Sequence, residues 1–157
     1  MSLANIKLNN TKSGFTIVEL LIVVVVIAIL AAITIVSYNG ITTRANASAA
    51  KATASTWQKK IELYQAETSS YPYSISDIDV AGKSYQINDT SFTAAAPTSD
   101  NGKSKVLVQP CGATAPTNKA GTSGIRITYY NYDSSPAGSN VINIGTTTAC
   151  ATALATS

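Results

Sequence analysis

Histidine is absent from the chain, and charged residues of either sign are scarce. Without histidine, neither a Ser-His nor a Cys-His dyad can form, and no Walker or GxGxxG phosphate loop is present. The two cysteines cannot complete a tetrahedral zinc site on their own. We therefore expect no catalytic residue, no metal site and no cofactor, and we predict that the protein is not an enzyme.

Four aspartates form a weak candidate for a calcium site. Asp77 and Asp79 are two residues apart and could bind calcium together with Asp89 or Asp100. A solvated turn is the simpler interpretation of this spacing, and it is the one we favour.

The low charge content also limits the choice of partners. Charged residues make up 12% of the 157 residues, with a formal net charge of +3. Lys7 and Lys12 precede Phe15; without them, nine Lys and Arg face eight Asp and Glu, which leaves +1. This balance gives no electrostatic argument for nucleic-acid binding. The length suits one globular domain in addition to a membrane helix.

A long apolar run dominates the first quarter of the chain. From Phe15 to Val36 only Thr16, Glu19 and Thr34 interrupt the hydrophobic side chains. About 22 helical residues span roughly 33 Å, enough to cross the ~30 Å hydrocarbon core of a bilayer. Because a bilayer forces backbone amides to bond internally, we predict a transmembrane helix here.

The flanks of this run indicate its orientation. Lys7 and Lys12 precede it without any acidic residue, which places the N-terminal side in the cytoplasm and the C-terminal side outside. A secretory signal cut after Ala32 fits less well, because the run is long and contains Glu19. Glu19 could be an interfacial carboxylate that snorkels or is protonated. The residues on either side of Glu19 indicate another interpretation of this carboxylate.

The segment Lys12-Ser13-Gly14-Phe15-Thr16-Ile17-Val18-Glu19-Leu20-Leu21 resembles the class III signal of type IV pilins and pseudopilins. The resemblance implies that prepilin peptidase cuts between Gly14 and Phe15 on the cytoplasmic face and methylates the new amino terminus. It also implies that Glu19 is the acidic residue at the fifth mature position. A cleaved leader, residues 1–14, would then precede a membrane or filament-core helix, residues 15–38.

Cleavage would give Glu19 a chemical role. The cut frees an ammonium group at Phe15, and a buried charge is tolerable only when it is paired. Phe15 and Glu19 are separated by about 6 Å along a helix axis, so an axially displaced subunit could place its Glu19 beside a neighbour's amine. We expect Glu19 to set the register of assembly, a role that the resemblance also implies.

The helix should continue beyond the apolar run, from Phe15 to Thr68. Trp57, Ile61 and Tyr64 recur at helical spacing and define one face of its amphipathic part, residues 39–68. We predict that this face packs on a C-terminal sheet. A helix of roughly 80 Å is too long for so small a domain to cover, so lipid or other subunits should bury its first half. Gly40 marks either local unwinding during assembly or close packing.

A small antiparallel sheet should complete the fold. Ser69 to Pro72 should end the helix, because Pro72 disfavours helical geometry at the preceding residue. The predicted strands are Lys83–Asn88, Ser104–Gln109, Ile125–Asp133 and Asn140–Ile144, within a globular region 69–157. The last two should form a hairpin. The predicted class is α+β, with three or four strands on the Trp57 face, as the resemblance to pilins implies.

Both cysteines lie on the outward side of the predicted membrane helix. Because that compartment is oxidising, we expect Cys111 and Cys150 to form a disulfide, which the resemblance to pilins supports. A loop of about 38 residues would gain ~3 to 4 kcal/mol and fix the tail 151–157 to the loop after the second strand.

The expected function is that of a structural subunit, a prepilin that forms a type IV pilus-like extracellular filament. Its partners would be other copies of the subunit, prepilin peptidase, a membrane assembly platform and, before assembly, lipid of the cytoplasmic membrane. A pseudopilin of a type II secretion or competence DNA-uptake machine shares every motif above. A membrane-anchored binding protein that never polymerises is an alternative of another class.

Overall fold

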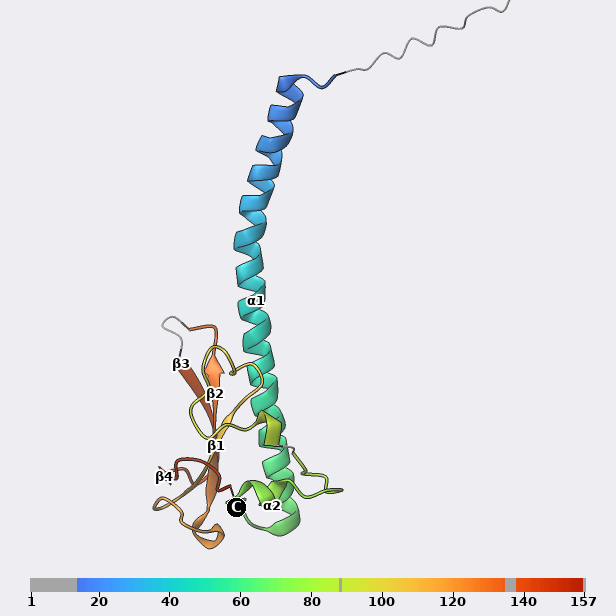
Figure 1. The fold of residues 1–157 in the computed structure, drawn as a ribbon. Coiled ribbons are helices and arrows are strands. Elements are labelled where there is room, and N and C mark those ends of the chain that lie inside the picture. Colours follow the sequence, from blue (N-terminus) through green and yellow to red (C-terminus); the bar gives the residue numbers. More distant parts are fainter. Residues whose placement is uncertain (1–13, 88, 135–137, 157) are drawn as a thin grey trace, which may run out of the picture. The chain divides into compact units, whose positions relative to one another are not determined.

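The computed structural model describes residues 14–87, 89–134 and 138–156. Two compact units divide the chain, one ending at Asn39 and the other beginning at Gly40. The elements are α1 (Ile17–Thr68), α2 (Ile75–Ile78), η1 (Asp89–Ser91), β1 (Leu107–Gly112), η2 (Lys119–Gly121), β2 (Gly124–Asn131), β3 (Gly138–Gly145) and β4 (Ala149–Cys150) (Figure 1). A long apolar helix followed by a small antiparallel sheet confirms the predicted α+β, pilin-like architecture.

The part of α1 in the first unit makes no core. Every residue from Gly14 to Asn39 is exposed, and the large hydrophobic side chains there range in exposure from 47% at Val25 to 90% at Phe15. Among the described helices, α1 alone is long and apolar enough to cross a membrane, and none of its most apolar 18-residue window is buried. This surface therefore lacks a covering layer within its own unit.

Helix α1 runs without a break through Gly40. A Cβ added at Gly40 would meet no atom within 4 Å, so close packing within the described chain does not explain this glycine. Local unwinding at Gly40 during assembly stays a prediction.

The second part of α1 presents one apolar face to the sheet. Its buried residues recur at alternating intervals of four and three, which places them on one side of a helix. They are Ala50, Ala54, Trp57, Ile61 and Tyr64. All but Ala50 share one core cluster with residues of β1 and β2, such as Val108, Ile125 and Ile127. Each large apolar side chain buried in this way contributes roughly 1.5 to 3 kcal/mol.

The end of α1 follows the predicted signal. Ser69 adopts a positive φ of 55°, and its amide donates to the carbonyl of Gln65 at 2.8 Å. This left-handed residue closes the last turn, a position that glycine more often occupies. Pro72 follows and is fully buried. The chain thereby turns away from α1 toward α2.

The four strands form one antiparallel sheet in the order β3-β2-β1-β4. Strands β2 and β3 form the predicted hairpin, with Ile125 opposite Ile144 and Ile127 opposite Ile142. Both strands begin one or two residues before their predicted starts. Gly145 has a φ of 69°, which glycine adopts easily, at the end of β3.

Strand β1 is displaced from its predicted position. It spans Leu107–Gly112 rather than 104–109, because Pro110 does not end it. The carbonyl of Pro110 accepts from the amide of Ala151. Since the nitrogen and carbonyl of one strand residue point to the same side, the Pro110 nitrogen faces away from β2. The β1–β2 ladder therefore loses no hydrogen bond.

The predicted strand Lys83–Asn88 is wrong over its described residues, 83–87, and Asn88 lies outside the described residues. Lys83 donates to the carbonyl of Val80, and Gln86 donates to Lys83, so local turns satisfy this backbone. Tyr85 and Ile87 are buried, which produced the alternating pattern without a neighbouring strand. Strand β4, only two residues long, was not predicted.

Candidate processing and assembly site

The predicted cleavage bond lies immediately before α1. Gly14 and Phe15 are not helical, and both are exposed. The side chain of Phe15 is 90% exposed, and a Cβ added at Gly14 would meet no atom within 4 Å. No described part of the chain therefore shields this bond from a peptidase. The cleavage itself stays a prediction.

Glu19 closes the first turn of α1 through a capping box with Thr16. One carboxylate oxygen, Oε2, accepts from the Thr16 amide at 2.9 Å and from the Thr16 hydroxyl at 2.8 Å. In return, Thr16 Oγ1 accepts from the Glu19 amide at 3.2 Å. This reciprocal arrangement satisfies donors that the first turn leaves without helical partners. It explains why α1 begins at Ile17 rather than at Phe15.

Thr16 is a site residue that our sequence interpretation missed. The signal was present, because Thr16-Ile-Val-Glu19 has the T-x-x-E spacing of a capping box before an apolar run. The capping box also gives Glu19 a local role that needs neither snorkelling nor a second subunit. Only a substitution that separates capping from charge can test an assembly role.

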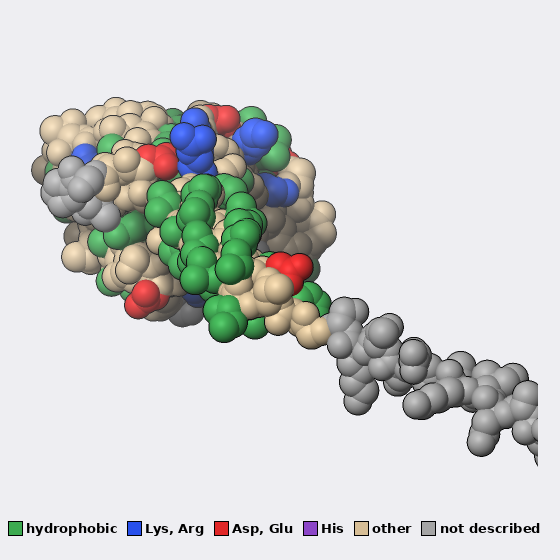
Figure 2. All heavy atoms as spheres, turned by 90° about the horizontal axis from the view of Figure 1, so that it is seen from above, with side chains coloured by type: hydrophobic (Ala, Val, Ile, Leu, Met, Phe, Trp, Pro, Cys, Tyr) green, Lys and Arg blue, Asp and Glu red, His purple; other side chains and the backbone are tan. Residues whose placement is uncertain are grey.

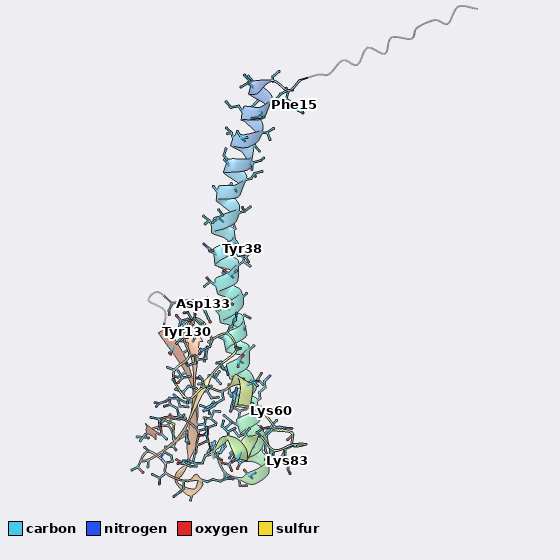
Figure 3. All side chains as sticks on the ribbon, in the orientation of Figure 1. Phe15, Tyr38, Lys60, Lys83, Tyr130 and Asp133 are labelled. Atoms are coloured by element: carbon cyan, nitrogen blue, oxygen red, sulfur yellow. A yellow bond between two sulfur atoms is a disulfide. The ribbon has the colours of Figure 1, made fainter. Side chains whose placement is uncertain are left out.

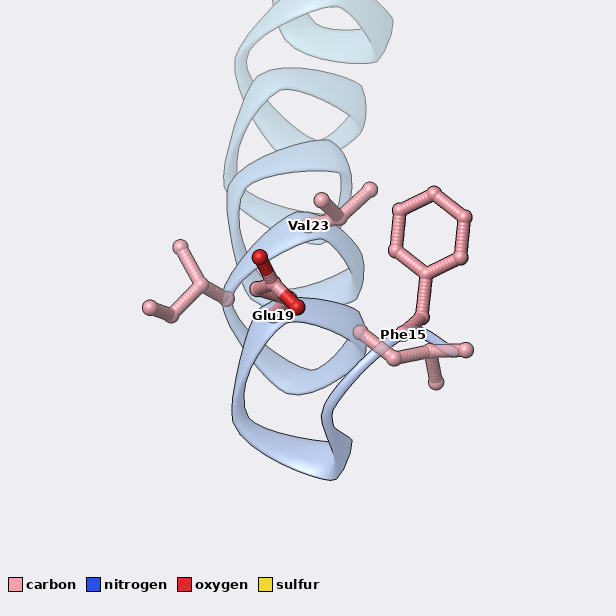
Figure 4. A pocket seen from close by; sticks show the side chains of 5 residues that line it. Phe15, Glu19 and Val23 are labelled. Carbon is pink, nitrogen blue, oxygen red and sulfur yellow. The ribbon is translucent and has the colours of Figure 1, made fainter. Parts of the chain in front are cut away.

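An open apolar groove of about 500 Å³ lies beside this carboxylate. Phe15, Leu20, Ile22 and Val23 line it together with Glu19, all from one end of the apolar segment (Figure 4). Hydrophobic side chains gather around this end of α1 (Figure 2). Because one helix supplies all of the described walls, another apolar body could pack closely against the carboxylate.

The remaining predicted residues lie in the second unit. Cys111 and Cys150 form a disulfide between β1 and β4, as predicted. Cys111 is buried inside β1 instead of in a loop after a strand, which corrects our description of its surroundings. The C-terminal tail lies beside β1, because the Leu154 amide donates to the Val108 carbonyl at 2.8 Å.

The aromatic face of α1 has specific contacts as well as burial. Trp57, Ile61 and Tyr64 are each at most 2% exposed. Trp57 Nε1 donates to Ser91 Oγ at 3.0 Å, and the rings of Tyr64 and Tyr85 meet edge to face at 5.0 Å. These contacts fix α1 to the segments that connect it to the sheet.

A polar cluster that the sequence did not reveal joins α1, α2 and η2. Lys119 Nζ lies 3.1 Å from Asp77 Oδ1, donates to the Tyr64 hydroxyl and sits 5.0 Å from the centre of that ring. Asp77 Oδ2 accepts from the amides of Tyr73 and Ser74, both at 2.9 Å. Asp77 is therefore a structural anchor rather than part of a solvated turn.

These contacts shift two pKa values. Burial raises the pKa of Asp77, but the Ser74 and Tyr73 amides and Lys119 outweigh it, so the pKa lies below its usual range. The hydrogen bond to Tyr64 and the pairing with Asp77 raise the pKa of Lys119.

Across the described residues, no three His, Cys, Asp or Glu side chains gather as a candidate metal site.

Comparison with known proteins gives one result. The family model described as the prokaryotic N-terminal methylation motif matches residues 9–35. No curated protein and no solved structure matches the chain. The matched range contains Gly14, Phe15 and Glu19, and the rest of the chain lies outside it. Over residues 9–35 the chain carries the prokaryotic N-terminal methylation motif, the class III signal peptide of type IV pilins.

Proposed function

We propose that this protein is a prepilin, the structural subunit of a type IV pilus-like extracellular filament. The methylation motif supports a type IV pilin-like or pseudopilin precursor and indicates a structural protein rather than an enzyme. It implies processing by prepilin peptidase and assembly with other pilins. The apolar helix and the motif together suggest membrane anchoring before assembly.

The observation that carries the filament proposal is the uncovered apolar part of α1. Its large hydrophobic side chains are at least 47% exposed, and the second unit has a separate core of its own. A soluble monomer rarely exposes a continuous apolar surface of this length. Lipid covers it before assembly, and helices of other subunits replace the lipid in the filament.

Glu19 is suited to guide that replacement. Oε2 caps the chain's own helix, whereas Oε1 has no hydrogen-bond partner among the described residues. The second oxygen can accept a charge-assisted hydrogen bond from the ammonium that cleavage creates at Phe15 of a neighbouring subunit. A subunit in the wrong register would leave both charges buried without partners, which is strongly unfavourable.

Three substitutions separate capping from charge. Glu19→Gln keeps the capping box, because glutamine can accept the same hydrogen bonds, but it removes the charge. Thr16→Ala removes both hydrogen bonds of the Thr16 hydroxyl, so it weakens the cap to the single bond from the residue-16 amide and keeps the charge. Glu19→Ala removes both. Filament yield after shearing from cells, measured beside the amount of processed subunit in the membrane, is the readout.

The register role predicts few or no filaments from Glu19→Gln and Glu19→Ala, with near-normal cleavage, while Thr16→Ala retains assembly. Glu62→Ala, an exposed carboxylate in the second unit, is the matched control and should assemble normally. Normal filaments from Glu19→Gln would contradict the charge argument. If only Thr16→Ala and Glu19→Ala fail, Glu19 acts as a helix cap alone.

The same cells distinguish the other functions. Long filaments outside the cell at native expression support a pilus subunit. A cleaved protein that remains at the membrane would instead favour a pseudopilin of a secretion or DNA-uptake machine. An uncleaved leader and a monomer after detergent extraction would favour a membrane-anchored binding protein.

A further inference from the structure

A polar, aromatic cavity of about 150 Å³ lies within the second unit, away from the methylation motif in the sequence. Helix α1 contributes one side, and the end of β2, the start of β3 and the residues after β2 contribute the other. The polar and aromatic residues that line it include Lys51, Tyr130, Asn131, Tyr132, Asp133 and Asn140. Figure 3 shows Tyr130 and Asp133 at the same end of the sheet.

The aromatic wall is fixed within the protein. The hydroxyl of Tyr132 donates to the carbonyl of Ser99 at 2.8 Å. The rings of Tyr130 and Tyr132 meet edge to face with their centres 4.6 Å apart. Gly102 lies directly behind Tyr130, since a Cβ there would be 2.3 Å from the Tyr130 Cβ. A ligand would therefore meet rings that are already ordered, which lowers the entropic cost of binding.

The amide wall is held as well. Asn131 Nδ2 lies 3.4 Å from Asn140 Oδ1 across the β2–β3 pair, and the Asp133 amide donates to Asn131 Oδ1 at 3.0 Å. Each of these amide side chains still has hydrogen-bonding capacity for a ligand, because an amide offers two donor hydrogens and two acceptor positions.

Three polar groups at the cavity remain unused by the described part of the chain. The ammonium of Lys51, the hydroxyl of Tyr130 and the carboxylate of Asp133 make no hydrogen bond or ion pair within residues 14–87, 89–134 and 138–156. Lys51 and Asp133 carry opposite charges, so the pair is neutral in sum. The cavity therefore combines strong donors and acceptors without a net charge.

This chemistry selects among ligand classes. A phosphate backbone would meet the Asp133 carboxylate and only one cation, so nucleic acid is disfavoured. A cationic ligand would meet Lys51. A sugar ring carries no charge and presents vicinal hydroxyls that can bond to carboxylate, ammonium and amide groups.

We propose that this cavity binds one neutral pyranose unit of a glycan. Its volume is below the ~300 to 1,000 Å³ of sites for drug-sized ligands, so one ring occupies it and the rest of the glycan extends into solvent. Burial of one ring by few contacts gives a dissociation constant on the order of millimolar. The proposal does not depend on filament assembly.

Saturation-transfer NMR on the full-length protein in nanodiscs tests the site, with lipids that lack sugar headgroups. The probes are the methyl glycosides of glucose, galactose, mannose and N-acetylglucosamine at about 10 mM, the concentration that a millimolar site requires. We expect transfer to at least one glycoside. Asp133→Ala and Lys51→Ala should each weaken binding roughly tenfold, as loss of a charged hydrogen bond does.

Lys59→Ala and Glu62→Ala, exposed residues of α1 that do not line the cavity, are the matched controls and should bind like the wild type. All four substituted side chains are exposed, and the fluorescence of Trp57 verifies that each variant is folded. Absence of transfer from every glycoside would overturn the proposal. Binding that survives the double change of Lys51 and Asp133 would also overturn it, as would binding of an oligothymidylate in place of the sugars.

Discussion

The core of the second unit yields a quantitative prediction at Ile61. This side chain is fully buried in the cluster that joins α1 to β1 and β2. Ile61→Ala removes three carbon atoms, or roughly 2.4 kcal/mol of transfer free energy, and leaves a cavity that raises the cost further. Alanine recovers about 0.4 kcal/mol through its better helix propensity. We expect the free energy of unfolding to fall by about 3 kcal/mol.

The chain contains its own probe for this measurement. Trp57 is the only tryptophan, and it lies in the same core with 1% of its surface exposed. Its fluorescence during urea denaturation of the detergent-solubilised protein reports whether the core is intact. With a denaturant slope near 2 kcal/mol per molar for a domain of this size, the midpoint should fall by about 1.5 M.

Leu63 provides a matched control two residues away on the same helix. It is 42% exposed, so Leu63→Ala should cost below about 1 kcal/mol. A midpoint for Ile61→Ala within about 0.3 M of the wild type, roughly the error of such a measurement, would refute a structural role for the burial of Ile61. Equal losses in the free energy of unfolding for Ile61→Ala and Leu63→Ala would refute it as well, because burial on one helix face could not then be the cause.

Three further predictions concern the second unit. Replacing Cys111 and Cys150 by serine should lower the free energy of unfolding by ~3 to 4 kcal/mol in urea denaturation; an unchanged midpoint would show that the bond adds no stability. The lowered pKa of Asp77 means that its stabilisation is present above the unfolded-state pKa and is lost as the pH falls below roughly 4. Asp77→Asn should therefore flatten the acid limb of a thermal-midpoint profile, whereas a limb identical to the wild type would contradict the assignment. Gly145→Ala should cost more in thermal unfolding than Gly82→Ala, because both have positive φ but only Gly145 has Tyr71 and a Ser123 carbonyl within 3 Å of an added Cβ; equal costs would refute the steric argument.

The helical part of the fold could be predicted from sequence because each of its two parts carries its own signal. The apolar run from Phe15 and the stripe of Trp57, Ile61 and Tyr64 both favour α1, and neither depends on distant residues. Ala50 and Ala54 extend the same stripe by two turns, but small side chains give a weak hydrophobic signal.

The strands were harder to predict because tertiary contacts decide where they begin and end. Tyr85 and Ile87 alternate as in a strand, yet local turns satisfy the backbone around them. Pro110 resembles a strand end, yet its nitrogen faces away from β2. Strand β4 has only two residues, so no period can be read from it.

The methylation motif was the most predictable part of the candidate site, since it occupies contiguous residues with fixed spacing. The partnership of Thr16 with Glu19 was also predictable from the T-x-x-E spacing but was missed, because Glu19 was interpreted through lipid and neighbouring subunits rather than through its own helix turn. Contacts among Tyr64, Asp77 and Lys119 join three separate segments. No local pattern could have indicated that cluster.

The mature N terminus tests the central claim most directly. Mass spectrometry of the protein isolated from its native membrane and from any sheared filaments gives the first residue and its modification. We expect a chain that begins at Phe15 and carries a methyl group on the new amine. A chain that retains Met1, or one that begins after Ala32, would contradict it, because no ammonium at Phe15 would then exist for Glu19 to bind.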